Sequence, residues 1–252
     1  MRAVVMRARG GPEVLEVADL PVPEPGPKEV RVRLKAAALN HLDVWVRKGV
    51  ASPKLPLPHV LGADGSGVVD AVGPGVEGFA PGDEVVINPG LSCGRCERCL
   101  AGEDNLCPRY QILGEHRHGT YAEYVVLPEA NLAPKPKSLS FEEAAAIPLT
   151  FLTAWQMVVD KLGVRPGDDV LVMAAGSGVS VAAIQIAKLF GARVIATAGS
   201  EDKCQACRDL GADLAINYRA EDFVAVMTAA GIAADVILDM VGGGYIQRNI
   251  EA

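Results

Sequence analysis

Basic residues are in short supply in this sequence of 252 residues: 24 lysines and arginines stand against 31 aspartates and glutamates, a formal net charge of −7. The chain therefore lacks a basic stripe that could neutralise phosphates, and we expect no nucleic-acid or membrane partner. A secretory signal is also missing, because Arg7 and Arg9 interrupt the stretch where its apolar run would lie. These absences predict a cytoplasmic protein that acts on a small molecule.

Internal repeats and low-complexity segments are absent as well. One uncharged run, Val170 to Ala187, approaches the length of a membrane helix. Its central Gly176 and Gly178 instead indicate a buried strand, a turn and a buried helix. Half of the residues are hydrophobic, so the chain can fill two domains of about 100 to 150 residues each.

The first half of the chain has the pattern of strands. Lys28 to Lys35 alternates apolar and basic residues with the period of two that is typical of a half-buried strand. Further short apolar runs follow at Gly67 to Val72, Glu84 to Asn88 and Ala122 to Leu127. Prolines and glycines separate these runs and mark turns. We predict a twisted antiparallel sheet or partial barrel.

The pattern changes after residue 133. Ser140 and Glu143 form a predicted capping box for a helix from Phe141 to Ile147, which Pro148 should end or kink before a second helix to about Asp160. Strands and helices then alternate, which predicts a parallel, doubly wound sheet. The predicted strands are Val170–Ala174, Arg193–Thr197, Leu214–Asn217 and Asp235–Asp239, and the predicted helices are Val179–Phe190, Ser200–Leu210 and Glu221–Ala229.

Four cysteines lie within 15 residues, at Cys93, Cys96, Cys99 and Cys107. Thiolates at this spacing can surround one tetrahedral ion within a short lobe, so we predict one structural Zn²⁺ with these four ligands. An iron–sulfur cluster is an alternative, because the run partly matches a ferredoxin pattern. Disulfides are a further alternative, although thiols three residues apart rarely reach disulfide geometry.

A glycine-containing turn joins the first parallel strand to the next helix. In a doubly wound sheet this turn holds a dinucleotide pyrophosphate, because backbone amides and the helix dipole favour anions there. Gly176 and Gly178 fill the first two positions of the glycine pattern, but Val181 stands at the third. An ordinary tight turn is the alternative. The predicted cofactor contacts in the turn are Ala175, Gly176, Ser177, Gly178 and Val179.

The end of the second parallel strand lacks the carboxylate that an NAD site presents to the ribose. Without it a 2′-phosphate is not repelled, and Ser200 and Lys203 could bind that group. We therefore predict NADPH as the cofactor in preference to NADH. The alternative is that Lys203 is a solvated helix residue.

With these features the chain resembles the medium-chain dehydrogenase/reductases, and most closely their quinone oxidoreductase branch. The stretches that carry the resemblance are Gly62, Asp64, Gly65 and Gly67, then Gly73 and Gly75, Pro81 to Val85, and Ala122 to Tyr124. The resemblance implies a GroES-like domain over residues 1–133 with a zinc lobe at 91–109. It further implies a Rossmann domain over residues 134–252. The family's sheet has six strands and this chain ends after the fourth, so we expect a domain that is incomplete at its C-terminus. A full-length form is expected to be a homodimer or tetramer.

The family's alcohol dehydrogenases hold a second, catalytic zinc, and the resemblance places three positions of this chain at its ligands. They carry Asn40, Ala63 and Leu149. An amide, a methyl and an isobutyl group cannot form an open zinc site. The resemblance therefore implies hydride transfer from NADPH to a quinone or α,β-unsaturated carbonyl without a catalytic zinc. Alcohol or aldehyde oxidoreduction, or cofactor binding without catalysis, are the alternatives.

Catalytic candidates follow from the same resemblance. Asn40, with Asp43 and Trp45 beside it, matches the motif that faces the nicotinamide, and Thr153 matches a threonine near that ring. Tyr218 matches a tyrosine beside the adenosine 2′-phosphate. The alternatives are that Asn40 and Thr153 only cap turns or helices and that Trp45 belongs to the core.

Two further patterns are given structural interpretations. Cys204 and Cys207 spell CxxC, but on one helix face they are expected to pack in the core. His116 and His118 lie in a glycine-flanked run of alternating charge that is typical of a solvated turn rather than a metal site.

Overall fold

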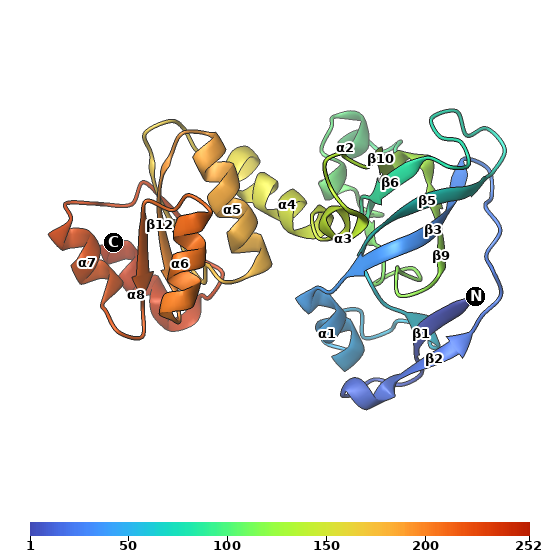
Figure 1. Cartoon of the computed structure of the whole chain (residues 1–252), viewed down its shortest axis with the longest axis horizontal. Helices are drawn as coiled ribbons and strands as arrows, with labels where there is room; N and C mark the ends of the chain where they lie inside the picture. Colours follow the sequence, from blue (N-terminus) through green and yellow to red (C-terminus); the bar gives the residue numbers. More distant parts are fainter. The chain divides into compact units, whose positions relative to one another are not determined.

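A five-stranded antiparallel sheet, in the order β10-β6-β5-β3-β9, organises the first part of the chain. The computed structural model describes all residues from 1 to 252, which fall into two compact units, Met1–Leu149 and Thr150–Ala252 (Figure 1). Val30 and Val32 are fully buried, as the period of two predicts. The strands are β3 (Glu29–Ala38), β5 (Asp64–Val72), β6 (Glu84–Ile87), β9 (Tyr124–Pro128) and β10 (Leu132–Pro134).

Smaller elements complete the first unit. A three-stranded sheet has the order β2-β1-β4, and β7 pairs with β8. Short 3-10 turns lie at Pro12–Val14, Asp104–Leu106 and Glu129–Asn131. The remaining elements are β1 (Arg2–Met6), β2 (Leu15–Asp19), β4 (His59–Val60), β7 (Gly90–Leu91), β8 (Gln111–Ile112), α1 (His41–Lys48), α2 (Glu97–Leu100) and α3 (Phe141–Ala145). Of these, only α3 has a counterpart in the sequence prediction.

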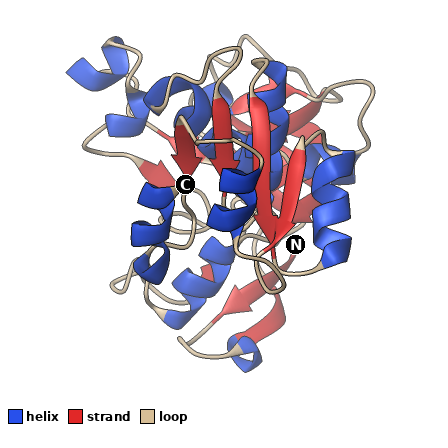
Figure 2. Ribbon diagram, turned by 90° about the vertical axis from the view of Figure 1, so that its left-hand side faces the viewer, coloured by secondary structure: helices blue, strands red, loops and turns tan.

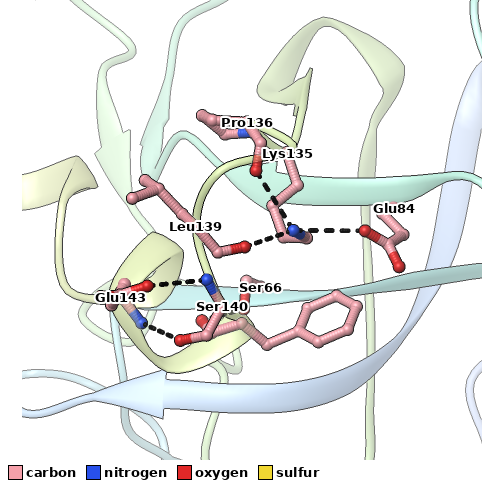
Figure 3. A network of polar contacts seen from close by, with 8 residues as sticks. Ser66, Glu84, Lys135, Pro136, Leu139, Ser140 and Glu143 are labelled. Carbon is pink, nitrogen blue, oxygen red and sulfur yellow. Dashed lines mark hydrogen bonds and ion pairs between the residues drawn. The ribbon is translucent and has the colours of Figure 1, made fainter.

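The predicted capping box is present at the start of α3. Ser140 Oγ accepts from the Glu143 backbone N–H at 3.1 Å, and Glu143 Oε2 accepts from the Ser140 backbone N–H at 2.8 Å. The preceding segment is tied down by Lys135, whose Nζ donates to Leu139 O at 2.6 Å and lies 3.2 Å from Glu84 Oε2 (Figure 3). Ser66 Oγ donates to Phe141 O at 2.5 Å. These bonds fix the first turn of α3 to β5 and β6.

The next helix, α4 (Pro148–Trp155), begins at Pro148. A π-helical turn, Gln156–Lys161, extends it. The second unit then has a parallel sheet in the order β13-β12-β11-β14. Strands alternate with helices along it (Figure 2). Its strands are β11 (Asp169–Val172), β12 (Arg193–Ala198), β13 (Leu214–Asn217) and β14 (Val236–Leu238). Its helices are α5 (Gly178–Leu189), α6 (Glu201–Asp209), α7 (Phe223–Ala229) and α8 (Ile246–Glu251), with a 3-10 turn at Gly243–Tyr245.

Both faces of this sheet are covered, as a doubly wound sheet requires. Val170 and Val194 pack with the apolar residues of α5 on one face. Leu171 and Ile195, the next residues along the same strands, pack with Phe223 and its neighbours of α7 on the other. The strand order reverses beside β11, so the chain has the switch point at which such sheets bind ligands.

The structure confirms the predicted fold class of an antiparallel unit followed by a parallel, doubly wound sheet. Gly191 and Gly211, just beyond α5 and α6, have positive φ angles of 77° and 103°. Residues 133 and 134, where we expect the domain boundary, lie within the first compact unit, and that boundary stays a prediction. None of the helices has both the length and the apolar composition that crossing a membrane requires.

Candidate metal centre and cofactor site

The four cysteines lie in a lobe that β7 and β8 close at its base, with Leu91 paired to Gln111. Cys96 is the residue before α2, and Cys107 follows the 3-10 turn Asp104–Leu106. The four Sγ atoms all lie within 4.8 Å of one another. Residues that are spread over 15 positions therefore converge on one point.

The sulfur geometry fits a zinc ion. Zn–S bonds of about 2.3 Å separate the sulfurs of a tetrahedral site by about 3.8 Å. Cys99 Sγ lies 3.4 Å from Cys96 Sγ and 3.9 Å from Cys93 Sγ. All four thiols are free, so the structure contains no disulfide here. The backbone N–H of Arg95, which hydrogen-bonds to Cys93, lowers the pKa of that thiol to about 5. Burial and hydrogen bonds with the neighbouring thiols raise the pKa of Cys96 to about 11, so the four thiols are not equally acidic.

A second polar cluster surrounds Asn40 at the start of α1. The Asp43 carboxylate, whose residue is 6% exposed, accepts three hydrogen bonds. The donors are the Asn40 backbone N–H at 2.8 Å, the Gly62 backbone N–H at 3.1 Å and the Tyr121 hydroxyl at 2.7 Å. Burial and the nearby Asp43 raise the pKa of Tyr121. Asp43 thus joins the start of α1 to the loop before β5.

The Asn40 side chain reaches in the other direction, to Asp64 at the start of β5. Asn40 Nδ2 donates to Asp64 Oδ2 at 2.9 Å, and the Leu149 backbone N–H donates to Asp64 Oδ1 at 2.9 Å. Asp64 is 1% exposed, and burial raises the pKa of its carboxyl to about 6, with the charge of Asp43 adding to the rise. The three positions that the resemblance assigns to zinc ligands thus carry Asn40, Ala63 and Leu149, of which the first and last hydrogen-bond to Asp64.

The other catalytic candidates are distributed over both units. Trp45 lies on α1, is 47% exposed and meets the His41 ring edge-on at 5.0 Å, so it does not belong to the core. Thr153 lies on α4 in the second unit, whereas Asn40, Asp43 and Trp45 lie in the first. Their joint action at the nicotinamide stays a prediction.

The predicted phosphate turn lies between β11 and α5. Ser177 caps α5, because its Oγ accepts from the Ser180 backbone N–H at 3.3 Å. Ala174 adopts a left-handed φ of 49° and turns the chain out of the strand. A Cβ at Gly176 would lie 3.0 Å from Lys203 Cδ, so a side chain there would displace the end of that lysine. The N–H groups of Ala175 and Ser177 donate to Thr197 O and Ala174 O, which leaves the amides of Gly178 and Val179, the first two residues of α5, as donors for an anion.

A pocket of about 240 Å³ lies at this turn and at the end of β12. Its lining includes four of the predicted cofactor residues, Gly176, Ser177, Lys203 and Tyr218, together with Ala174, Ala198 and Gly199. The predicted contacts Ala175, Gly178, Val179 and Ser200 lie in the adjoining turn and helix starts and do not line it. No Asp or Glu lines the pocket.

Two residues here escaped the sequence reasoning. Gly199 keeps the strand end open, because a Cβ there would lie 2.7 Å from Tyr218 Oη and 3.5 Å from Arg219 Nε. Arg219 therefore brings a second positive charge beside the pocket. Arg219 could have been predicted as a cofactor contact from its position next to Tyr218, just after β13. Asp64 was visible only as part of the resemblance, with no role attached, and nothing singled out Tyr121.

The Cys204–Cys207 pair and the histidines His116 and His118 have structural roles. Cys204 and Cys207 are 0% and 2% exposed within α6, and burial raises the pKa of both thiols. Each histidine of the loop accepts a backbone N–H at Nδ1: His116 from Ile112 at 3.1 Å and His118 from Val60 at 3.2 Å. Both histidines therefore have a role in holding the loop.

Comparison with known proteins agrees with this architecture. Residues 26–137 match the family described as the alcohol dehydrogenase GroES-like domain, and residues 178–252 match the zinc-binding dehydrogenase family. A crystal structure of an NAD-dependent alcohol dehydrogenase is 86% identical, with a TM-score of 0.97, over 100% of this chain and 74% of its own. The chain belongs to the zinc-type alcohol dehydrogenase-like family of medium-chain dehydrogenase/reductases.

Within this family the chain is similar to members with different names. A zinc-type alcohol dehydrogenase-like protein of Schizosaccharomyces pombe is 39% identical over 87% of the chain, which spans 62% of that relative's length. A quinone oxidoreductase of Pseudomonas syringae pv. Tomato DC3000 is 36% identical, with a TM-score of 0.81, over 99% of the chain and 69% of its own. The family thus includes alcohol dehydrogenases and quinone oxidoreductases of the same fold.

Proposed function

We propose that the chain is the greater part of an NADPH-dependent reductase of quinones or α,β-unsaturated carbonyls that uses no catalytic zinc. The observation that carries the proposal is the hydrogen-bonded pair of Asn40 and Asp64, at the place where the resemblance puts zinc ligands. An amide and a buried carboxylate that already accepts two N–H groups form a polar surface for a substrate oxygen rather than an open metal site.

NADPH, when bound, supplies a hydride for the β-carbon of the substrate. The chain's part is to bind, to orient and to stabilise. The turn from Ala175 to Val179 would hold the pyrophosphate through the backbone amides at the N-terminus of α5, since those of Ala175 and Ser177 already donate within the protein. Lys203, Tyr218 and Ser200 would hold the 2′-phosphate, with Arg219 adding positive charge. The Asn40 amide would donate to the oxygen on which negative charge develops, with the α-carbon protonated from solvent.

The zinc lobe has a supporting role in this proposal. Cys93, Cys96, Cys99 and Cys107 would hold one zinc ion with all four positions occupied, which leaves no position for water or substrate. The ion would stabilise the lobe without taking part in hydride transfer. A cytoplasmic location and a homodimeric or tetrameric full-length form complete the proposal.

Alcohol or aldehyde oxidoreduction with NADH is a second candidate, because the 86% identical structure is named as an NAD-dependent alcohol dehydrogenase. Titration of the chain with NADPH and NADH, followed by turnover assays on quinones, enones, aldehydes and alcohols, separates the two. The proposal expects tighter binding of NADPH and turnover of quinones or enones. Preference for NADH with turnover of alcohols would establish the second candidate, and binding without turnover would indicate a non-catalytic protein.

A further inference from the structure

Two groups favour the same sense of the Asn40 carboxamide: the Asp64 carboxylate, and the Asp43 backbone N–H that the Asn40 side chain meets in the capping box of α1. Asn40 Nδ2 donates to Asp64 Oδ2, while the Asn40 backbone N–H is taken by Asp43 on the helix side. Two further hydrogen bonds hold Asp64. Its side-chain Oδ1 accepts from the Leu149 backbone N–H, and its backbone carbonyl accepts from Thr120 Oγ1 at 2.7 Å. The carboxylate is therefore a fixed acceptor for one end of the amide.

We propose that Asp64 is a positioning residue that fixes which end of the Asn40 carboxamide faces the reacting carbonyl. An amide has a donor end and an acceptor end of nearly the same shape, so its hydrogen-bond partners decide its orientation. The Asp64 carboxylate is the partner of the donor end, so Nδ2 lies on the Asp64 side and its second N–H remains for the substrate oxygen. This inference rests on the proposed function, since it assigns Asn40 to the reaction.

The same geometry predicts what a proton on Asp64 would do. Oδ1 has to accept from Leu149, so the proton would go to Oδ2, which would then donate to the carbonyl oxygen of Asn40. A protonated Asp64 would thus favour the reversed carboxamide while the Asp43 N–H of the capping box favours the original one, and the amide would lose its single orientation. No lysine, arginine or histidine forms an ion pair with Asp64. The ionisable groups that act on it are Asp43 from α1 and Tyr121 from the segment before β9.

Burial raises the pKa of Asp64 to about 6, and the charge of Asp43 adds to this rise. This change therefore falls within the pH range of an ordinary activity assay. Above pH 6 the carboxylate holds the amide in the productive sense, and below it the protonated form no longer does so. Turnover by the wild-type chain should fall as the pH falls through about 6.

Asp64→Asn is the sharpest test, because it reproduces the protonated state at every pH. The new amide must offer its oxygen to the Leu149 N–H, so its nitrogen faces Asn40 Nδ2 donor to donor and the productive orientation of the carboxamide is no longer favoured. We expect kcat to fall roughly 10- to 100-fold and to lose its dependence on pH near 6. The dissociation constant for NADPH should not change, because the pocket at Lys203 and Tyr218 is built from the second unit.

Two variants separate positioning from stability. Ser66→Ala removes another buried hydrogen bond of β5, the one to Phe141 O, without touching Asn40, and should lower stability while leaving kcat intact. The double variant Asn40→Asp/Asp64→Asn restores every hydrogen bond of the pair with donor and acceptor exchanged. Its stability should recover while its turnover stays low, because position 40 no longer carries a donor. Recovery of both would mean that neither the Asn40 amide nor its orientation by Asp64 takes part in the reaction.

A readout independent of turnover completes the test. The side-chain amide signals of Asn40 in a ¹⁵N–¹H spectrum, assigned by their loss in Asn40→Asp, should shift with a midpoint near pH 6 in the wild type. In Asp64→Asn they should not titrate. If the wild type turns over no substrate, the proposed function fails but these signals still decide the orientation. Signals that ignore both pH and the Asp64 substitution, or a kcat that is unchanged in Asp64→Asn, would overturn the inference.

Discussion

The cysteine lobe, residues 91–109, and the Asn40–Asp64 pair represent two outcomes for places where the family can hold metal. In the lobe, four thiols from one short segment lie within 4.8 Å of one another and fit a closed zinc site. At the pair, an amide and a carboxylate from distant segments hydrogen-bond to each other at 2.9 Å. Under the proposed function, this difference separates a structural use of metal in the lobe from a reaction based on oriented hydrogen bonds at the pair.

Loss of a lobe cysteine should have the largest effect on stability. Cys96→Ser removes one thiolate of four, and we expect the free energy of unfolding to fall by roughly 3 kcal/mol or more. Denaturant unfolding followed by circular dichroism measures this change, with Arg95→Ala in the same lobe as the matched control. A variant as stable as the wild type that has lost turnover would place the lobe's metal in the reaction and break the comparison.

Ionisation of Asp64 should have the next largest effect. Because its pKa is raised to about 6 in the folded chain, the stability it contributes is present at low pH and is lost as the pH rises to about 6. Between the ordinary pKa of an aspartate and about pH 6, the free energy of unfolding should fall by roughly 3 kcal/mol. Buried His59, whose pKa burial lowers to about 4, acts in the opposite sense and loses stability as the pH falls below its ordinary value.

The difference between the wild type and Asp64→Asn isolates the Asp64 contribution, because His59 is common to both. Unfolding free energies measured from pH 4 to pH 7 should show the wild type weakening relative to the variant as the pH rises towards about 6. Parallel curves for the two proteins would show that the carboxyl of Asp64 titrates as an exposed group does.

The preference for NADPH over NADH should depend neither on the cysteine lobe nor on the Asn40–Asp64 pair. Lys203→Ala removes a positive charge from the pocket of the second unit and should weaken NADPH binding roughly 10- to 100-fold, with NADH binding unchanged. Lys188→Ala, a change of the same charge elsewhere in that unit, is the control. Fluorescence titration with both cofactors gives the result, and equal losses for NADPH and NADH would show that Lys203 does not read the 2′-phosphate.

The smallest effect is expected at the cap of α3. Ser140→Ala removes an acceptor for the Glu143 N–H and should cost about 1 kcal/mol. Zinc content and the Asn40 amide signals should stay the same, since the cap bonds only within its own turn. A shift of those signals in Ser140→Ala would show that the arrangement of Asn40 and Asp64 depends on α3.

Local patterns made most of the fold predictable. The strand from Leu214 to Asn217 has the predicted ends, and the capping box at Ser140 is present. Strand β5 begins at Asp64 rather than Gly67, because Gly65 and Gly67 serve close packing instead of a turn. A Cβ at Gly67 would lie 2.3 Å from Arg33 O on the neighbouring strand.

The candidate site was predictable where its residues are neighbours in sequence. The cysteines and the turn at Gly176 carry their spacing in the chain itself. The partners of Asp64 do not, because Asn40 and the Leu149 N–H lie 24 and 85 positions away and are brought to it by the strands. Helix α1 was not predicted, although Asn40 and Asp43 form a capping box at its start and Gly49 ends it in a left-handed conformation. Asn40 and Asp43 were interpreted only through the family resemblance.

The zinc content of purified protein tests the separation of structure from reaction most directly. Metal analysis of the wild type and of Cys96→Ser, each in parallel with a turnover assay, gives the zinc content per chain and the turnover rate of each protein. The account predicts one zinc per wild-type chain and none in Cys96→Ser, in keeping with a single four-thiolate site. Two zinc ions per wild-type chain, or one that remains in Cys96→Ser together with turnover, would contradict it.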